Sequence, residues 1–381
     1  MARQRCFRVE VTSVQIFDVA IVGGGPAGST CAAFCALAGL RTVVLEREKF
    51  PREKVCGDCL NPSCWRVIER LGLTQKLLSL PHSKLSSVEF ISIDGRAVIV
   101  DLPSGADREI SVKRSLFDDL LLRRAHELGA EIRDQTTVTA LNCNSDWRIE
   151  TAPEEMFYAR ILIGADGRNS TVARLCNLLP RPARERVALQ AHVPLPRDFG
   201  NRVVLQFLIE GYSGQAPVNE TELNLCLVGK PSTISTLRDW ASRQFQLPGD
   251  QPWRTVTPLT RSSLPCARGN LFFVGDAARV VEPFTGEGIY YALRSGELAA
   301  NTVTKMLGGE ERQSVLREFA RAYAEMYRGR LWINRLARAA VLRPHLGSAL
   351  IRPGRISRSI FKLLTAKIVS STNRHSERSE A

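Results

Sequence analysis

The feature that most restricts the possible folds of this chain is a glycine-rich segment between two apolar runs. The first run, FDVAIV, occupies residues 17–22, and the segment GGGPAG follows directly at residues 23–28. The second run, RTVVL, occupies residues 41–45. Short apolar runs predict buried strands, and the small residues at 26–40 predict a helix between them. Together they predict a β–α–β unit that contains a G-x-G-x-x-G turn.

The glycines of this turn have distinct predicted tasks in binding a dinucleotide. Gly23 permits a tight turn, Gly25 lets the backbone approach a pyrophosphate, and Gly28 lets the helix pack closely on the strand. The phosphates would lie at the helix N-terminus, where free N–H groups and the helix dipole favour anions. Glu46 follows the second strand, where a carboxylate can bind ribose hydroxyls. A glycine-rich turn without a ligand is the alternative, and the strand, helix and acid together favour the dinucleotide site.

Two further turns follow predicted buried strands later in the chain. The sequence GADGRNS at residues 164–170 follows the strand at 161–163, and GDAA at 275–278 follows the strand at 271–274. Each of them alone indicates no more than a turn. In this order, however, the three motifs resemble the flavoprotein family of aromatic-ring hydroxylases and geranylgeranyl reductases. The resemblance runs from about residue 17 to residue 306.

The resemblance implies that the chain binds FAD and gives roles to particular residues. Asp276 would bind the ribityl chain, and Asp166 would order the loops near the pyrophosphate. Arg114 resembles an arginine that reaches the FAD phosphates, and the alternative for it is a surface arginine at a helix start. A helix N-terminus near Gly286 would stabilise negative charge on reduced flavin. The cofactor-binding residues predicted in this way are Gly23, Gly25, Ala27, Gly28, Glu46, Arg47, Arg114, Asp166, Gly275, Asp276, Pro283, Gly286 and Gly288.

Two segments resemble the geranylgeranyl reductase branch more than the rest of the family. One is KVCGD at residues 54–58, and the other is PFTGEGI at residues 283–289. Halogenases and some polyketide hydroxylases share versions of both. The reductases also carry a Tyr-x-Trp-x-Phe-Pro segment in the substrate pocket. Here Tyr212 and Pro217 match it and are predicted substrate residues, whereas Gly214 and Ala216 replace the Trp and the Phe, so a smaller pocket wall is expected.

Cys56 is the predicted catalytic residue, because the KVCGD segment of this branch lies near the flavin. Cys56 and Cys59 form a C-x-x-C pair, but a metal site would need a second pair at suitable spacing, and the sequence has none. Three roles remain possible for Cys56: a redox disulfide, a thiol beside the flavin, or a packing residue. The scattered positions of the ten cysteines favour reduced thiols used as small hydrophobes.

The predicted fold class is α/β, with a Rossmann-type FAD-binding domain, an inserted antiparallel β-sheet substrate domain and a helical C-terminal region. A strand pair at 88–100 that turns at Asp94-Gly95, and β-type patterns from 187 to 228, indicate the inserted sheet. The predicted division is a loose leader at 1–16, an FAD-binding domain at 17–85, 109–177 and 266–308, a substrate domain at 86–108 and 178–265, and a basic helical region at 309–381.

The net charge of +13 is concentrated at the C-terminus, where residues 321–381 carry 13 Lys or Arg against three acids. Residues 355–369 form a basic amphipathic pattern that suits an anionic membrane surface, and the alternative is a helix packed on the enzyme. No nucleic-acid partner is expected. No apolar run reaches the roughly 18–20 residues of a membrane span, and the N-terminus lacks a signal peptide's pattern. A cytoplasmic protein is therefore expected, with peripheral membrane association as an open alternative.

These observations predict an FAD-dependent oxidoreductase that acts on a lipophilic small molecule, with geranylgeranyl-reductase-like reduction of a C=C bond favoured. A flavin-dependent monooxygenase or halogenase of an aromatic or polyketide substrate is the first alternative. A flavin-free protein that escorts prenyl groups is another, and the intact glycine motifs argue against it. Because the chain has no second G-x-G-x-x-G unit, NAD(P)H would bind transiently, or another electron donor would serve.

Overall fold

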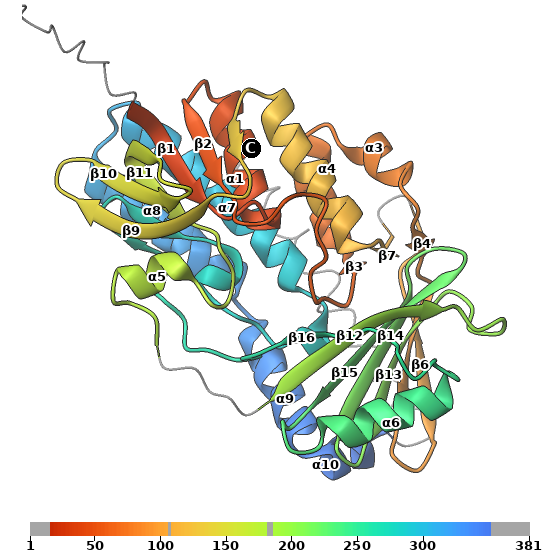
Figure 1. Cartoon of the computed structure of the whole chain (residues 1–381). Coiled ribbons are helices and arrows are strands. Elements are labelled where there is room, and N and C mark those ends of the chain that lie inside the picture. The colour runs from red at the N-terminus through yellow and green to blue at the C-terminus, as the bar shows by residue number, and fades with distance from the viewer. Residues whose placement is uncertain (1–15, 106–107, 181–185, 352–381) are drawn as a thin grey trace, which may run out of the picture.

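The computed structural model describes residues 16–105, 108–180 and 186–351. The described residues form two large sheets in separate parts of the molecule, with a small third sheet between them (Figure 1). The first sheet carries the glycine-rich turn, and the second is built from the segments in which the sequence predicts an inserted sheet. The predicted α/β fold with an inserted, mostly antiparallel sheet is therefore confirmed.

The first sheet is parallel at its centre, in the order β18, β11, β1, β2, β8. Its central strands are buried on both faces, and TVVL of β2 is buried at every residue, as parallel strands require. An antiparallel hairpin, β9 and β10, extends from β11, and the short β17 flanks β18. The strand bounds are β1 Ile16–Val22, β2 Thr42–Leu45, β8 Glu131–Arg133, β9 Thr137–Cys143, β10 Trp147–Ala152, β11 Met156–Gly164, β17 Ala267–Arg268 and β18 Leu271–Phe273.

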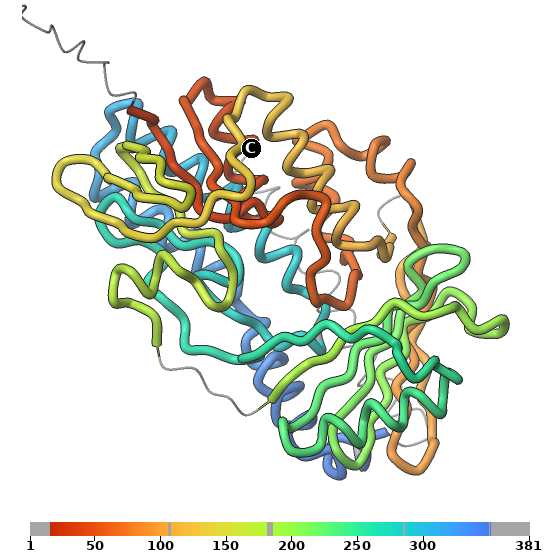
Figure 2. Tube along the Cα trace, in the orientation of Figure 1, coloured from red at the N-terminus to blue at the C-terminus, as the bar shows by residue number. Residues whose placement is uncertain are grey.

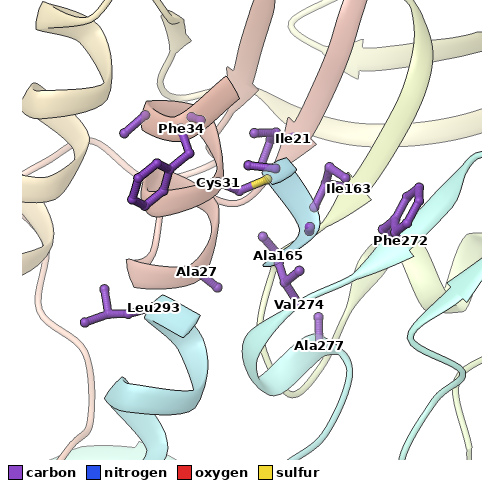
Figure 3. Packing of buried hydrophobic residues seen from close by; sticks show 14 of the residues in the cluster. Ile21, Ala27, Cys31, Phe34, Ile163, Ala165, Phe272, Val274, Ala277 and Leu293 are labelled. Atoms are coloured by element: carbon purple, nitrogen blue, oxygen red, sulfur yellow. The ribbon is translucent and has the colours of Figure 1, made fainter. Parts of the chain in front are cut away.

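The helices α1 (Pro26–Leu37), α4 (Arg114–Glu127) and α7 (Gly288–Leu307) pack beside this sheet, with α1 in contact with the other two. Figure 3 shows their shared core, in which Cys31 of α1 lies next to Ile21 of β1. Close packing of α1 and α7 requires Gly296, because a Cβ there would lie 2.3 Å from the carbonyl oxygen of Ala27. The small residues of α1 therefore place its N-terminus tightly against the sheet edge.

The second sheet has the order β16, β12, β15, β14, β13, β5, β6, and β5 with β13 is its parallel pair. The predicted hairpin at 88–100 is confirmed as β5 and β6, and Gly95 in its turn has a φ of +81°. The helix α6 (Ile234–Gln244), which the sequence did not predict, packs on β15. The strand bounds are β5 Ser87–Ile91, β6 Ala97–Asp101, β12 Val187–Pro194, β13 Arg202–Leu208, β14 Gly211–Pro217, β15 Glu222–Gly229 and β16 Arg254–Val256.

The third sheet joins three short strands, β3 (Cys59–Leu60), β7 (Ile110–Ser111) and β4 (Ser83–Lys84). Shorter helices lie around it and after β11: α2 Trp65–Arg70, α3 Thr74–Leu78 and α5 Thr171–Leu175. The chain leaves the first sheet twice to form the second sheet. The strands β5 and β6 come from the segment before β7, and β12 to β16 come from the segment after α5.

The C-terminal helices run from the first sheet to the second, as the blue part of the trace in Figure 2 shows. Phe319 of α8 (Arg312–Met326) packs edge-on against Phe272, with ring centroids 5.4 Å apart. Two further helices, α9 (Leu331–Leu342) and α10 (Pro344–Leu350), contact β14 and β13. The predicted amphipathic pattern at 355–369 lies outside the described residues. No helix in the described part of the chain is long and apolar enough to cross a membrane.

Candidate active site

All three sequence motifs lie at one edge of the first sheet. They follow β1, β11 and β18, which are parallel neighbours, so the carboxyl ends of these strands meet. A cavity of about 810 Å³ begins at this edge and reaches the second sheet. The predicted site residues that line it are Gly23, Gly25, Ala27, Glu46, Arg47, Cys56, Arg114, Asp166, Tyr212, Gly275, Asp276, Pro283, Gly286 and Gly288. Gly28 and Pro217 do not line it.

The glycine-rich turn meets the steric demands of a dinucleotide site. Gly23 has a φ of +104°, and a Cβ there would lie 2.6 Å from the carbonyl oxygen of Ala165. A Cβ on Gly28 would lie 1.9 Å from the carbonyl oxygen of Gly23. Gly25 differs, because its φ of −72° suits any residue and its Cβ would meet only the Arg52 guanidinium, at 3.4 Å. The fold itself does not require a glycine there, so open space at Gly25 fits a ligand that approaches the backbone.

Glu46 is buried, and its carboxylate accepts hydrogen bonds that hold the glycine-rich turn in place. One oxygen accepts a hydrogen bond from the N–H of Gly24 at 2.7 Å, and the other accepts from the N–H of Glu48 at 2.9 Å. Carboxylate oxygens have further lone pairs, so ribose hydroxyls can still bind. Arg47 is exposed and lies 3.4 Å from the Glu48 carboxylate. The structure thus gives Glu46 a second task, that of holding the turn, which the sequence did not predict.

Asp166 and Asp276 both line the cavity and are held by different partners. One oxygen of Asp166 accepts from the N–H of Val172 at 3.0 Å, while the other is buried with no hydrogen-bond partner among the described residues. Burial raises the pKa of Asp166 above its usual range. Arg168 forms an ion pair of 3.0 Å with Asp276, and Arg261 donates to the carbonyl oxygens of Asp276 and Ala277. Sequence reasoning gave neither arginine a role.

A cluster of cations lies beside the motifs. Arg114 donates to both oxygens of Asp118, at 2.7 and 2.8 Å, and Arg52 reaches the same carboxylate at 3.1 Å. Arg114 is buried, so its alternative as a surface arginine is wrong. Burial, together with the charges of Arg168, Arg114 and Arg52, lowers the pKa of Lys54 to about 8. This excess of positive charge fits an anionic ligand.

The loop that carries Cys56 is fixed by the second sheet. The carbonyl oxygen of Cys56 accepts from Gln190 at 2.9 Å, from Asn224 at 2.8 Å and from the Cys226 thiol at 3.3 Å. Two residues later, the buried Asp58 lies 2.8 Å from Nε2 of His192. Burial raises the pKa of the Cys56 thiol, so the thiol form predominates at neutral pH. Cys56 and Cys59 are free thiols. Within the described ranges, no group of three or more His, Cys, Asp or Glu side chains could hold a metal ion.

The third motif ends at the N-terminus of α7, which borders the cavity. Gly286, with a φ of +68°, ends a short 3-10 turn at Pro283–Thr285, and α7 begins at Gly288. Between them, the buried Glu287 accepts from Arg330 at 2.9 Å and from Asn334 at 3.2 Å. Glu287 therefore connects the start of α7 to α9. The sequence did not predict this connection, because nothing in the α9 pattern indicates a partner.

The far end of the cavity is apolar. Tyr212, Phe90 and Phe207 surround Phe284, with ring centroids 5.3 to 6.4 Å from it. Gly214 and Ala216 line this end, as the sequence predicts for a smaller wall, while Pro217 is buried and its carbonyl oxygen binds Ser111. The helices α9 and α10 complete the wall with Ile333, Leu336, Ala337, Ala340 and Gly347. The helices α9 and α10 are therefore part of the site.

Comparison with known proteins agrees with this geometry. A family model described as an FAD binding domain matches residues 17–196. The chain is 32% identical over 320 residues to a menaquinone reductase of Mycobacterium tuberculosis, covering 74% of this chain and 75% of the relative. It is 31% identical over 320 residues to a geranylgeranyl diphosphate reductase of Rhodobacter capsulatus, covering 76% of each chain.

Solved structures show the same fold at lower identity. A flavin-dependent brominase superposes with a TM-score of 0.76 at 20% identity, covering 93% of this chain and 94% of the brominase. A probable FAD-dependent monooxygenase of Pseudomonas aeruginosa superposes with a TM-score of 0.74 at 18% identity, covering 88% of this chain and 100% of the monooxygenase.

Proposed function

We propose that this chain reduces a carbon–carbon double bond in a lipophilic substrate. The chain belongs to the family of FAD-dependent oxidoreductases that includes menaquinone and geranylgeranyl diphosphate reductases. One observation carries the proposal: the cavity continues without interruption from the glycine-rich turn into an apolar compartment. The apolar lining comprises Val88, Phe90, Leu102, Ala188, Val203, Leu205, Phe207, Tyr212, Val228 and Phe284. Such a wall suits a hydrocarbon chain and gives polar substrates few partners.

The residues at the polar end fit FAD. The N-terminus of α1 and the open space at Gly25 would hold the pyrophosphate, and Glu46 would bind the ribose. Asp276, oriented by Arg168, would bind the ribityl chain, and the N-terminus of α7 would face the flavin ring. When bound, FAD supplies a hydride for the reduction. The apolar compartment excludes water from the double bond, while the hydrogen bonds to the Cys56 carbonyl keep the loop between the two ends in place.

We also propose that NAD(P)H or another donor reduces the flavin transiently, because the sequence has no second G-x-G-x-x-G unit. The decisive experiment reduces the bound flavin without oxygen and then adds geranylgeranyl diphosphate, a polyprenyl menaquinone or air. Faster re-oxidation with an isoprenoid, together with a hydrogenated product, supports the reductase. A hydroxylated or halogenated product formed only with oxygen supports the monooxygenase or halogenase alternative, whose fold the brominase and the monooxygenase share.

We propose further that the substrate reaches the cavity from an anionic membrane surface. Leu336 lines the cavity and is itself exposed, and Leu346 on α10 is exposed as well. Arg335 on α9 and Arg343 between α9 and α10 are exposed cations, which attract anionic lipids. Flotation with vesicles of anionic lipid at low salt tests this idea. A chain that ends before Arg352 should keep its flavin and lose part of its vesicle binding, and a full-length protein that never floats contradicts the proposal.

A further inference from the structure

A buried carboxyl that no sequence motif indicates lines the cavity. Glu109 immediately precedes β7, and its carbonyl oxygen accepts a hydrogen bond from the N–H of Leu85 at 3.0 Å. The pairing of β7 with β3 places it near Cys59, and the residue is only 9% exposed. Glu109 therefore presents an ionisable group to the cavity from the third sheet, away from the glycine motifs.

The carboxyl of Glu109 has no partner within the described part of the chain. Burial is the sole cause of the shift in its pKa, so no hydrogen-bond donor or cation stabilises its carboxylate. Every other fully buried acid in the described ranges has a donor or a cation: Glu46, Asp58, Asp118, Glu282, Glu287 and Glu297. An unpaired buried carboxylate is costly, so this arrangement favours the protonated carboxyl.

Burial alone raises the pKa of Glu109 to about 7. The titratable groups that face it are the thiols of Cys59 on β3 and Cys64 in the following 3-10 turn, and burial raises the pKa of both. These thiols are neutral at neutral pH, so neither stabilises a Glu109 carboxylate. A proton donor works best when its pKa is near the working pH, and Glu109 meets this condition better than the Cys56 thiol.

We propose that Glu109 is the proton donor of the reduction and therefore a catalytic residue of this site. The assignment rests on the proposed function. Adding hydrogen across a double bond requires a hydride at one carbon and a proton at the other. The hydride comes from reduced FAD, which is oxidised and is later reduced again by its electron donor. The O–H bond of Glu109 breaks as the second C–H bond forms, and the resulting carboxylate regains a proton from water.

The test compares Glu109→Gln with a matched control, Glu325→Gln. Glutamine keeps the size of the side chain and has no acidic proton to transfer, and Glu325 is an exposed acid on α8, 3.1 Å from Arg328 and outside the cavity lining. Both variants should keep FAD and be reduced at the wild-type rate. Re-oxidation by geranylgeranyl diphosphate, whose reducible groups are its double bonds, should fall about 100-fold or more in Glu109→Gln only. Glu109→Asp, which retains an acid on a shorter side chain, should recover part of the rate.

A second readout does not depend on turnover. Infrared difference spectra of the FAD-bound protein should show a protonated-carboxyl C=O band that disappears as the pH rises through about 7. Glu325→Gln should retain this band and Glu109→Gln should lack it. Wild-type re-oxidation rates in Glu109→Gln, or an unchanged band in it, overturn the assignment alone. If no isoprenoid re-oxidises the wild-type flavin, the proposed function and the assignment fail together.

Discussion

Replacing Glu109 with glutamine should remove a loss of stability that the wild type undergoes as the pH rises toward neutral. In the unfolded chain this carboxyl titrates near its ordinary pKa of 4.5, whereas burial raises the pKa in the folded protein to about 7. Between these values the folded protein retains a proton that the unfolded chain has released. The free energy of unfolding of the wild type therefore falls as the pH rises across this interval and is constant above it. Glutamine has no charge and removes this dependence.

The size of the effect follows from the width of the interval. Each pH unit between the two pKa values corresponds to 1.36 kcal/mol, so the interval from 4.5 to about 7 corresponds to about 3 kcal/mol. Solvent screening reduces this value little, because Glu109 is only 9% exposed. The buried amide of the variant adds an offset of about 1–3 kcal/mol that does not change with pH. The pH-dependent part of the difference is therefore the quantity to measure.

Urea denaturation at a series of pH values measures this difference. Both proteins carry saturating FAD, so that the stabilisation by the cofactor is the same in each. The free energy of unfolding of Glu109→Gln minus that of the wild type should rise by about 3 kcal/mol between about pH 4.5 and about pH 8. A difference that stays constant over this range would show that Glu109 ionises normally in the folded protein, and would refute the reasoning.

Three further substitutions test the cofactor end of the cavity. Gly25→Val should abolish FAD binding and leave the fold intact, because the new side chain meets only Arg52 before it enters the pyrophosphate space; normal FAD affinity by fluorescence titration would contradict the placement of the motif. Asp276→Ala should weaken FAD binding by about 1.5–3 kcal/mol through loss of a charged acceptor, and full flavin occupancy after purification would argue against that role. Cys56→Ser should keep FAD and, if the thiol shapes the pocket beside the flavin, lose most turnover in a steady-state assay without loss of the Glu109 proton, whereas unchanged turnover would leave Cys56 as a packing residue.

The parts of the molecule that sequence predicts best depend on neighbouring residues in the chain. The β–α–β unit at 17–45 is one example, because steric limits on the turn act between residues such as Gly23 and Gly28. The hairpin at Asp94-Gly95 is another, since its turn and its alternating pattern are local. In both cases the sequence pattern alone determines the element and its bounds to within a few residues.

The parts that sequence misses depend on distant packing. Glu109 stands in a polar segment that suggests an exposed loop, and only the pairing of β7 with β3 and β4 buries it. The apolar pattern of α9 predicts a helix, but not that Leu336 and Ala340 close the cavity over β14. The hairpin β9–β10 was missed because exposed polar residues interrupt its apolar pattern.

The buried pair of Glu287 and Arg330 has a consequence for how the two ends of the cavity respond to ligands. Glu287 precedes the first residue of α7, and Arg330 immediately precedes α9, whose side chains form part of the apolar wall. A substrate that shifts α9 must either move the start of α7 with it or separate two buried charges, which is strongly unfavourable. Such a shift would couple occupancy of the apolar end to the surroundings of the flavin, and by thermodynamic reciprocity a bound flavin would then change the affinity for the substrate by the same factor.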